Sequence, residues 1–323
     1  MTEPFAPLPP QGRVFTSSWP VRVGDVDTEG RLRLDGIGRY LQDLGNDDLD
    51  DGGARSTHPV WIVRRTVIDV LVPPGWPDAL TLRRWCSGLS SSWCAERVQL
   101  TSANGGLIET EGFWINYSPQ TQRPARLGAE FTASIGGSTD NHRLRWRRWL
   151  HDDPPTGPGS PFPLRSSDFD PSRHVNNAVY LAAIEDQLAT RPELFARPYR
   201  ATIEYLKPIV PGAQLSIHTR NEPDGFTVWF VVDAVRRRYP GSPSASTTGG
   251  PFNTPTVTAA RQRQAPRGCP GVLAKRCGGS RPSVRRHSRL SRSNAATRAA
   301  YIDVARRERR RQNTSVWVRH DNA

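Results

Sequence analysis

Residues 168–177 bring together side chains that can break an acyl bond. The stretch holds an acid, an imidazole and two carboxamides, and a tyrosine follows it: Asp170, His174, Asn176, Asn177 and Tyr180. A carboxylate close to an imidazole supplies a nucleophile or activates a water, and the imidazole manages the transferred proton. If a helix begins at the asparagines, the unpaired N–H groups of its first turn can stabilise an oxyanion. The pattern indicates hydrolysis of an acyl bond, and no ligand spacing typical of a metal site accompanies it.

A weaker copy of this stretch lies 143 positions earlier, at residues 25–32. It keeps the acids Asp25 and Asp27 but lacks the histidine and the asparagines, so we expect both acids to be structural. The same offset aligns one arginine pair and three apolar pairs: Arg22 with Arg165, Leu32 with Val175, Ile37 with Tyr180, and Leu41 with Ile184. Self-similarity at so long a spacing indicates two domains of one type rather than a solenoid, with the chemistry in the second.

The periodicity of apolar residues predicts the same elements in each half. One helical stripe runs from Leu34 to Leu44 and can end at Gly52, and another runs at i, i+4, i+8 from Tyr180, where Asn176 or Asn177 can cap it. Strands are predicted at residues 67–72, 79–82, 93–101, 107–117, 201–206, 214–219 and 226–235. Residues 104–106, Asn-Gly-Gly, are typical of a hairpin turn. Each half is therefore predicted to be a helix laid on an antiparallel sheet, an α+β fold.

The order of these elements and the D-x-D-x-x-x-H-V-N-N-x-x-Y motif of residues 168–180 resemble the acyl-ACP thioesterases of the double-hotdog type. The resemblance covers roughly residues 10–235. It implies a tandem hotdog, in which each curled antiparallel sheet wraps one long helix. It also implies hydrolysis of the thioester between a fatty acyl chain and the phosphopantetheine arm of acyl carrier protein, without a cofactor. Some hotdog relatives act on acyl-CoA instead, so this donor stays open.

By this resemblance Asp170 and His174 occupy the positions of the family's catalytic acid and histidine. Two further positions differ from the plant enzymes: Ser172 replaces an asparagine, and Pro208 replaces a glutamate. We assign the catalytic roles to Asp170, His174, Asn176 and Ser172, and substrate binding to Asn177 and Tyr180. The two changed positions keep open a non-catalytic protein that only binds acyl thioesters.

Structural explanations compete with each of these assignments. Asp170 can serve as a turn residue, the two asparagines as helix caps, and Tyr180 as a core residue. Three polar residues on the first helix can face the second-half site, although an exposed polar face explains them as well: Gln42, Asp43 and Asn46.

Charge divides the chain near residue 235. Residues 1–235 hold 24 Lys and Arg against 28 Asp and Glu, a net charge of −4, whereas residues 236–323 hold 20 against 3, a net charge of +17. The second segment is rich in Pro, Gly, Ser and Arg, which is typical of a disordered tail outside the fold. We favour a frameshifted or inert continuation over a nucleic-acid-binding arm. No partner strand is evident after residues 226–235, so the second hotdog is predicted to be truncated, with an open edge.

The remaining features set the boundaries of the prediction. We expect hotdog domains at residues 1–150 and 151–235, a linker at residues 152–161, and the tail at 236–323. No signal peptide or membrane-spanning run is evident, and the four cysteines match no zinc pattern. These features predict a cytoplasmic enzyme with reduced thiols, for which a homodimer is one option.

Overall fold

The computed structural model describes residues 5–194 and 197–232, and the backbone of residues 312–319. Its helices are α1 (Leu34–Asp51), α2 (Ala129–Gly136) and α3 (Asn177–Ala189). The first-half strands are β1 (Phe15–Pro20), β2 (Trp61–Val72), β3 (Ala79–Leu89), β4 (Trp93–Ser102), β5 (Leu107–Ser118) and β6 (Arg123–Pro124). The later strands are β7 (Ser160–Phe162), β8 (Tyr199–Glu204), β9 (Leu215–Glu222), β10 (Gly225–Val232) and β11 (Gln312–Arg319).

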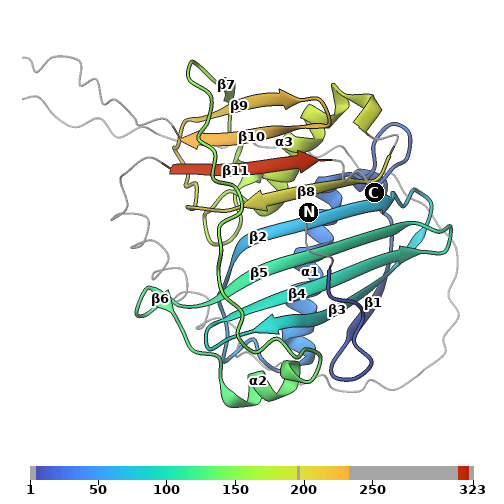
Figure 1. The fold of residues 1–323 in the computed structure, drawn as a ribbon, viewed down its shortest axis with the longest axis vertical. Helices are drawn as coiled ribbons and strands as arrows, with labels where there is room; N and C mark the ends of the chain where they lie inside the picture. Colours follow the sequence, from blue (N-terminus) through green and yellow to red (C-terminus); the bar gives the residue numbers. More distant parts are fainter. Residues whose placement is uncertain (1–4, 195–196, 233–311, 320–323) are drawn as a thin grey trace, which may run out of the picture. The chain divides into compact units, whose positions relative to one another are not determined.

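The strands form one antiparallel sheet in the order β1-β3-β4-β5-β2-β8-β11-β10-β9-β7, with β6 paired to β5 off this path (Figure 1). The order is two five-strand halves that meet where β2 pairs with β8, from Arg65 opposite Glu204 to Val70 opposite Tyr199. Reading outward from this joint, β5 and β11, β4 and β10, β3 and β9, and β1 and β7 occupy matching places. The sequence repeat is therefore a structural repeat, and the predicted tandem hotdog is confirmed.

The two long helices pack against the sheet and against each other. Leu34, Ile37 and Leu44 of α1 are fully buried, as are Ile184 and Leu188 of α3, and all five belong to one apolar cluster that spans both halves. Burying a leucine or isoleucine side chain contributes about 1.5–3 kcal/mol, so this shared core ties the two hotdogs into one unit. The described helices include none with the length and apolarity needed to span a bilayer.

The prediction that residues 236–323 lie wholly outside the fold is wrong for β11. This strand lies between β10 and β8, pairing from Val232 opposite Gln312 to Gly225 opposite Arg319 on one side, and with residues 200–204 on the other. The predicted open edge after residues 226–235 is therefore occupied, and the second hotdog is complete in strand number. Residues 236–311, on which the rest of the tail prediction falls, lie outside the described residues.

The chain just before the predicted linker of residues 152–161 is fixed at the joint between the two halves of the sheet. The backbone N–H groups of Trp149 and Leu150 donate to the Glu204 carboxylate at 2.9 and 3.2 Å, and Arg65 of β2 also bonds this acid, at 3.3 Å. Further along, the Asp152 carbonyl accepts from the Trp229 indole at 3.1 Å. Because Glu204 is fully buried by these contacts, residues 149–150 cover the joint between the two halves, and the linker begins directly after them.

Candidate active site

The loop before α3 holds Asp170 beside His174. The Asp170 N–H donates to the His174 carbonyl at 2.9 Å, and the His174 N–H donates back to Asp170 Oδ1 at 3.1 Å. Arg173 closes the turn, since its N–H donates to the Asp170 carbonyl at 2.9 Å and its φ is 61°. A left-handed residue is needed for so tight a turn, and an arginine adopts that conformation only when the surrounding contacts hold it. These bonds fix the spacing of the acid and the imidazole.

The first turn of α3 follows directly. Asn176 is the N-cap, and its Oδ1 accepts from the Ala178 N–H at 2.9 Å. The N–H groups of Val175 and Asn176 donate to the carbonyls of Ile209 and Asp168 at 2.9 and 2.8 Å. The capping role predicted for an asparagine is thus confirmed for Asn176, and the loop is tied to the chain that follows β8. The positive end of the α3 dipole lies at Asn176 and Asn177, two and three residues after His174.

The histidine is half-buried, and burial lowers the pKa of His174 below its ordinary value of 6.5, while the nearby Asp170 carboxylate acts in the opposite direction. The imidazole is therefore neutral at pH 7, the form that can accept a proton. Asp168 is different, because its buried carboxylate is held by Arg165 at 2.9 Å and by the Arg165 backbone N–H at 2.8 Å. Burial opposes ionisation there, but these hydrogen bonds lower the pKa of Asp168, which makes it a structural acid.

A cavity of about 30 Å³ lies between α1, α3 and the inner face of the first-half sheet. About half of its lining residues are apolar or small and the others are polar, including the charged Arg84 and Glu96: Gly38, Leu41, Gln42, Thr66, Arg84, Glu96, Val98, Thr110, Gly112, Trp114, Asn177, Leu181 and Tyr205. Asn177, the first residue of α3, is part of this lining, so the cavity reaches the chain three residues after His174. An acyl chain entering here needs the lining to open, because the cavity has room for only about two waters.

The other predicted site residues lie in different settings. Ser172 is half-buried within the loop, and Asn177 lines the cavity. Tyr180 is 3% exposed and its ring contacts those of Tyr205 and Phe230, with centroids 5.4 and 5.0 Å apart. Tyr180 therefore stands behind Tyr205, which itself lines the cavity.

Two further residues belong to the site or to its first-half copy. Of the three polar α1 residues that the sequence allowed either to face the site or to form an exposed face, Gln42 is half-buried in the cavity lining, whereas Asp43 and Asn46 are exposed. Glu185 of α3 was missed, although it is 7% exposed. It directly follows the apolar run of residues 178–184, but Asp186 and Gln187 come next, so the local sequence does not set it apart from an exposed polar group.

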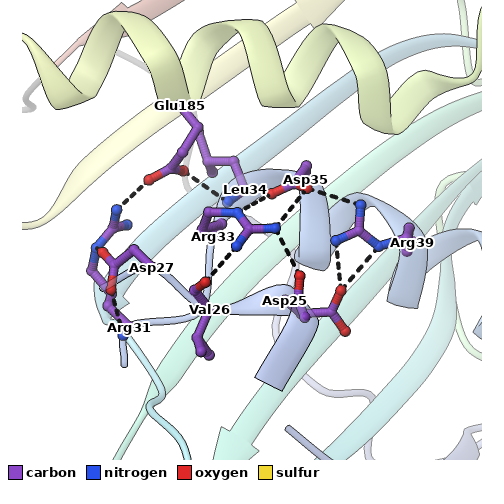
Figure 2. A network of polar contacts seen from close by, with 10 residues as sticks. Asp25, Val26, Asp27, Arg31, Arg33, Leu34, Asp35, Arg39 and Glu185 are labelled. Atoms are coloured by element: carbon purple, nitrogen blue, oxygen red, sulfur yellow. Dashed lines mark hydrogen bonds and ion pairs between the residues drawn. The ribbon is translucent and has the colours of Figure 1, made fainter. Parts of the chain in front are cut away.

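In the first-half copy of the motif, arginine side chains form ion pairs with both acids (Figure 2). Arg39 binds Asp25 at 2.5 Å, and Arg31 binds Asp27 at 2.9 Å. Arg31 also pairs with Glu185, whose second oxygen accepts from the Leu34 N–H at 2.9 Å. Both acids of this copy are therefore occupied by ion pairs, as the structural role predicted for them requires. Among the described residues, no three His, Cys, Asp or Glu side chains gather as a metal-binding group.

Comparison with known proteins shows the family. Residues 12–135 match the acyl-ACP thioesterase N-terminal domain, and residues 156–242 match the acyl-ACP thioesterase C-terminal domain. An uncharacterized protein of Mycobacterium tuberculosis is 45% identical over 229 residues, which cover 71% of this chain and 91% of that protein. The chloroplastic oleoyl-acyl carrier protein thioesterase of Coriandrum sativum is 19% identical over 207 residues, covering 56% and 55% of the two chains.

Two solved structures share the fold. An acyl-ACP thioesterase from Bacteroides thetaiotaomicron superposes with a TM-score of 0.59 at 18% identity, covering 68% of this chain and 92% of that one. The 12:0-ACP thioesterase from Umbellularia californica gives 0.56 at 17% identity, covering 69% and 93%. The chain belongs to the acyl-ACP thioesterase family and is a thioester hydrolase, which confirms the resemblance drawn from the motif.

Proposed function

We propose that this enzyme hydrolyses fatty acyl-ACP to a free fatty acid and holo-ACP at a site built on Asp170 and His174. The observation that carries the proposal is the contrast between the two copies of the loop. In the first copy both acids are occupied by arginines. In the second copy the equivalent acid lies beside a half-buried histidine, in the loop that leads into α3, and the first residue of α3 lines a cavity.

In the proposed reaction, neutral His174 takes a proton from a water as the water oxygen attacks the thioester carbon. The Asp170 carboxylate stabilises the imidazolium that forms, because an opposite charge nearby favours the protonated ring. The N–H of Asn177, the first residue of α3, stabilises the oxyanion together with the positive end of the helix dipole. The C–S bond then breaks, and the imidazolium returns the proton to the leaving phosphopantetheine sulfur. The cap of Asn176 holds this turn in place.

The cavity beside Asn177 is the proposed entrance for the acyl chain. Its apolar members, Leu41, Val98 and Leu181, give a chain of methylenes an environment free of water. We assign the enzyme to fatty acid biosynthesis in the cytoplasm, with acyl-ACP preferred over acyl-CoA. The homodimer stays a prediction.

The test is hydrolysis by the purified full-length chain, with release of free thiol followed over a series of saturated acyl-ACPs and the matching acyl-CoAs. We expect turnover with acyl-ACP, which Asp170→Asn lowers by about 10²-fold or more. Faster turnover of acyl-CoA would instead identify the alternative donor. If acyl-ACP binds without hydrolysis, the protein is a non-catalytic acyl-thioester-binding hotdog, and the proposed reaction is wrong.

A further inference from the structure

The two copies of the motif match bond for bond. In the first, the Asp27 N–H donates to the Arg31 carbonyl at 2.9 Å, and the Arg31 N–H donates back to Asp27 Oδ1 at 2.8 Å. In the second, Asp170 and His174 make the same two bonds at 2.9 and 3.1 Å. Gly30, at the position of Arg173, also has a positive φ, of 79°. The offset of 143 residues therefore relates equivalent atoms through this loop, and His174 stands where Arg31 stands in the first copy.

The first copy is completed by a residue from the opposite helix (Figure 2). Glu185 reaches from α3 to the start of α1, where its carboxylate accepts from the Leu34 N–H at 2.9 Å and pairs with Arg31. The helix of the second hotdog thus supplies a side chain to the motif of the first. The carboxylate covers the N-terminal turn of α1, the place where the second copy would bind an oxyanion.

The equivalent of Glu185 at the second copy is Gln42, and that of Leu34 is Asn177, since both pairs are 143 positions apart. The helix pair brings them together. The α1 backbone at Gly38 approaches α3 so closely that a Cβ there would lie 2.6 Å from Leu181 Cδ1 and 3.4 Å from Ala178 Cα. One turn further along α1, Gln42 lines the same cavity as Asn177, the residue before Ala178. Gln42 therefore faces the first turn of α3 as Glu185 faces that of α1.

We propose that Gln42 is a catalytic residue, supplied by the N-terminal hotdog to the site of the C-terminal hotdog. Its carboxamide NH₂ donates to the thioester carbonyl oxygen as negative charge develops there, together with the N–H of Asn177. The inference rests on the proposed function. The difference between Arg31 in the first copy and His174 in the second explains why the residue supplied by the opposite helix is Glu185 in one case and Gln42 in the other. A carboxylate suits the first copy, where Arg31 needs a partner, whereas in the second it would repel an oxyanion and bind the histidine as an imidazolium.

Three variants of the full-length chain test the inference on the acyl-ACP that the wild type hydrolyses fastest. Gln42→Ala should lower kcat by roughly 10²–10³-fold, the usual effect of removing one oxyanion donor, and should change KM little. Gln42→Glu should also lower kcat, and it should move the acid limb of the pH profile upward. The described charged group that raises the His174 pKa is Asp170, and the new carboxylate would add to its effect. A residue that only supports the fold would not move that limb.

Glu185→Gln is the matched control, because it makes the reverse substitution at the equivalent position of the first copy. It should lower the melting temperature, since Arg31 loses a partly buried partner, and it should leave kcat/KM close to that of the wild type. The inference is overturned if Gln42→Ala keeps wild-type kcat while Asp170→Asn shows its expected loss, and the proposed function then stands. An inactive wild type would overturn the proposed function itself. Melting temperatures of all variants separate loss of folding from loss of catalysis.

Discussion

The sharpest test of the proposed site compares Asp170→Asn with Asp27→Asn, because the two acids occupy equivalent loops. At Asp170 the amide keeps an oxygen that can accept the His174 N–H, so the loop bond of 3.1 Å survives and only the charge is lost. Without that charge, the imidazolium formed in the reaction loses its stabilising neighbour. We expect kcat to fall by about 10²-fold or more, equivalent to about 2.7 kcal/mol of transition-state stabilisation. The melting temperature should change little.

At Asp27 the same substitution removes an ion pair of 2.9 Å with Arg31, in which the two side chains are 24% and 14% exposed. Partly exposed pairs contribute up to about 1 kcal/mol, so the melting temperature should fall by roughly 2–4 °C. Activity should stay within about twofold of wild type, because Arg31 keeps Glu185 as a partner. Thiol-release kinetics and thermal unfolding measure both effects. Equal losses of activity in the two variants would mean that Asp170 is structural like its counterpart, and would refute the assignment.

Three further results are expected. The kcat/KM of the wild type should stay constant between pH 7 and pH 8 and should fall as the pH drops below about 6.5. Burial lowers the pKa of His174, so the neutral base is lost only when the ring protonates in this acidic range. A kcat/KM that already falls between pH 8 and pH 7 would contradict this. Glu204→Ala should destabilise the protein by about 3–5 kcal/mol, measured by denaturant unfolding, because it leaves Arg65 buried without its acid. Ser172→Ala should keep most of the wild-type activity if the acid and the histidine carry the reaction, and a loss as large as that of Asp170→Asn would add the hydroxyl to the mechanism.

Local pattern was enough to predict the elements of each half. The stripe from Leu34 to Leu44 became α1, which ends at Asp51 just before Gly52, and the motif after Asp168 became a capped loop and α3. These features depend on contacts between residues close in sequence, so periodicity and capping signals specify them. The strand predicted at residues 67–72 is too short, because β2 begins at Trp61 and therefore includes Arg64 and Arg65. Charged residues argue against a buried strand, but here the chain before the linker covers Arg65, and the Arg147 carbonyl accepts from its guanidinium at 2.8 Å.

The parts that could not be predicted depend on contacts between distant segments. The face on which Gln42 lies follows from the helical period, but the period does not say that α3 packs against that face. The role of Glu185 needed the same information, because its partners Arg31 and Leu34 lie more than 140 residues away. The repeat contains part of this information. Once the structure shows that Glu185 contacts the start of α1, the 143-residue offset identifies Gln42 as the equivalent residue for the start of α3.

Strand β11 gives the last prediction, on the chain after β10. In the first half β4 and β5 are joined by residues 103–106, whereas in the second half β10 and β11 are separated by residues 233–311. A chain that stops after residue 232 loses the strand between β10 and β8, with eight residue pairs on one side and five on the other. On the order of ten backbone hydrogen bonds at roughly 0.5–1.5 kcal/mol each are lost, as much as the whole stability of a typical domain. We expect this chain to be insoluble or unfolded in its second half.

The matched variant replaces residues 233–311 with the turn sequence of residues 103–106 and keeps β11. Because antiparallel neighbours need only a short connection, the strand can still reach its place between β10 and β8. This variant should match the full-length chain in melting temperature and in acyl-ACP hydrolysis. If the chain ending at residue 232 is as stable and active as the full-length protein, the pairing of β11 contributes nothing. If the short-turn variant folds but loses activity, residues 233–311 take part in catalysis.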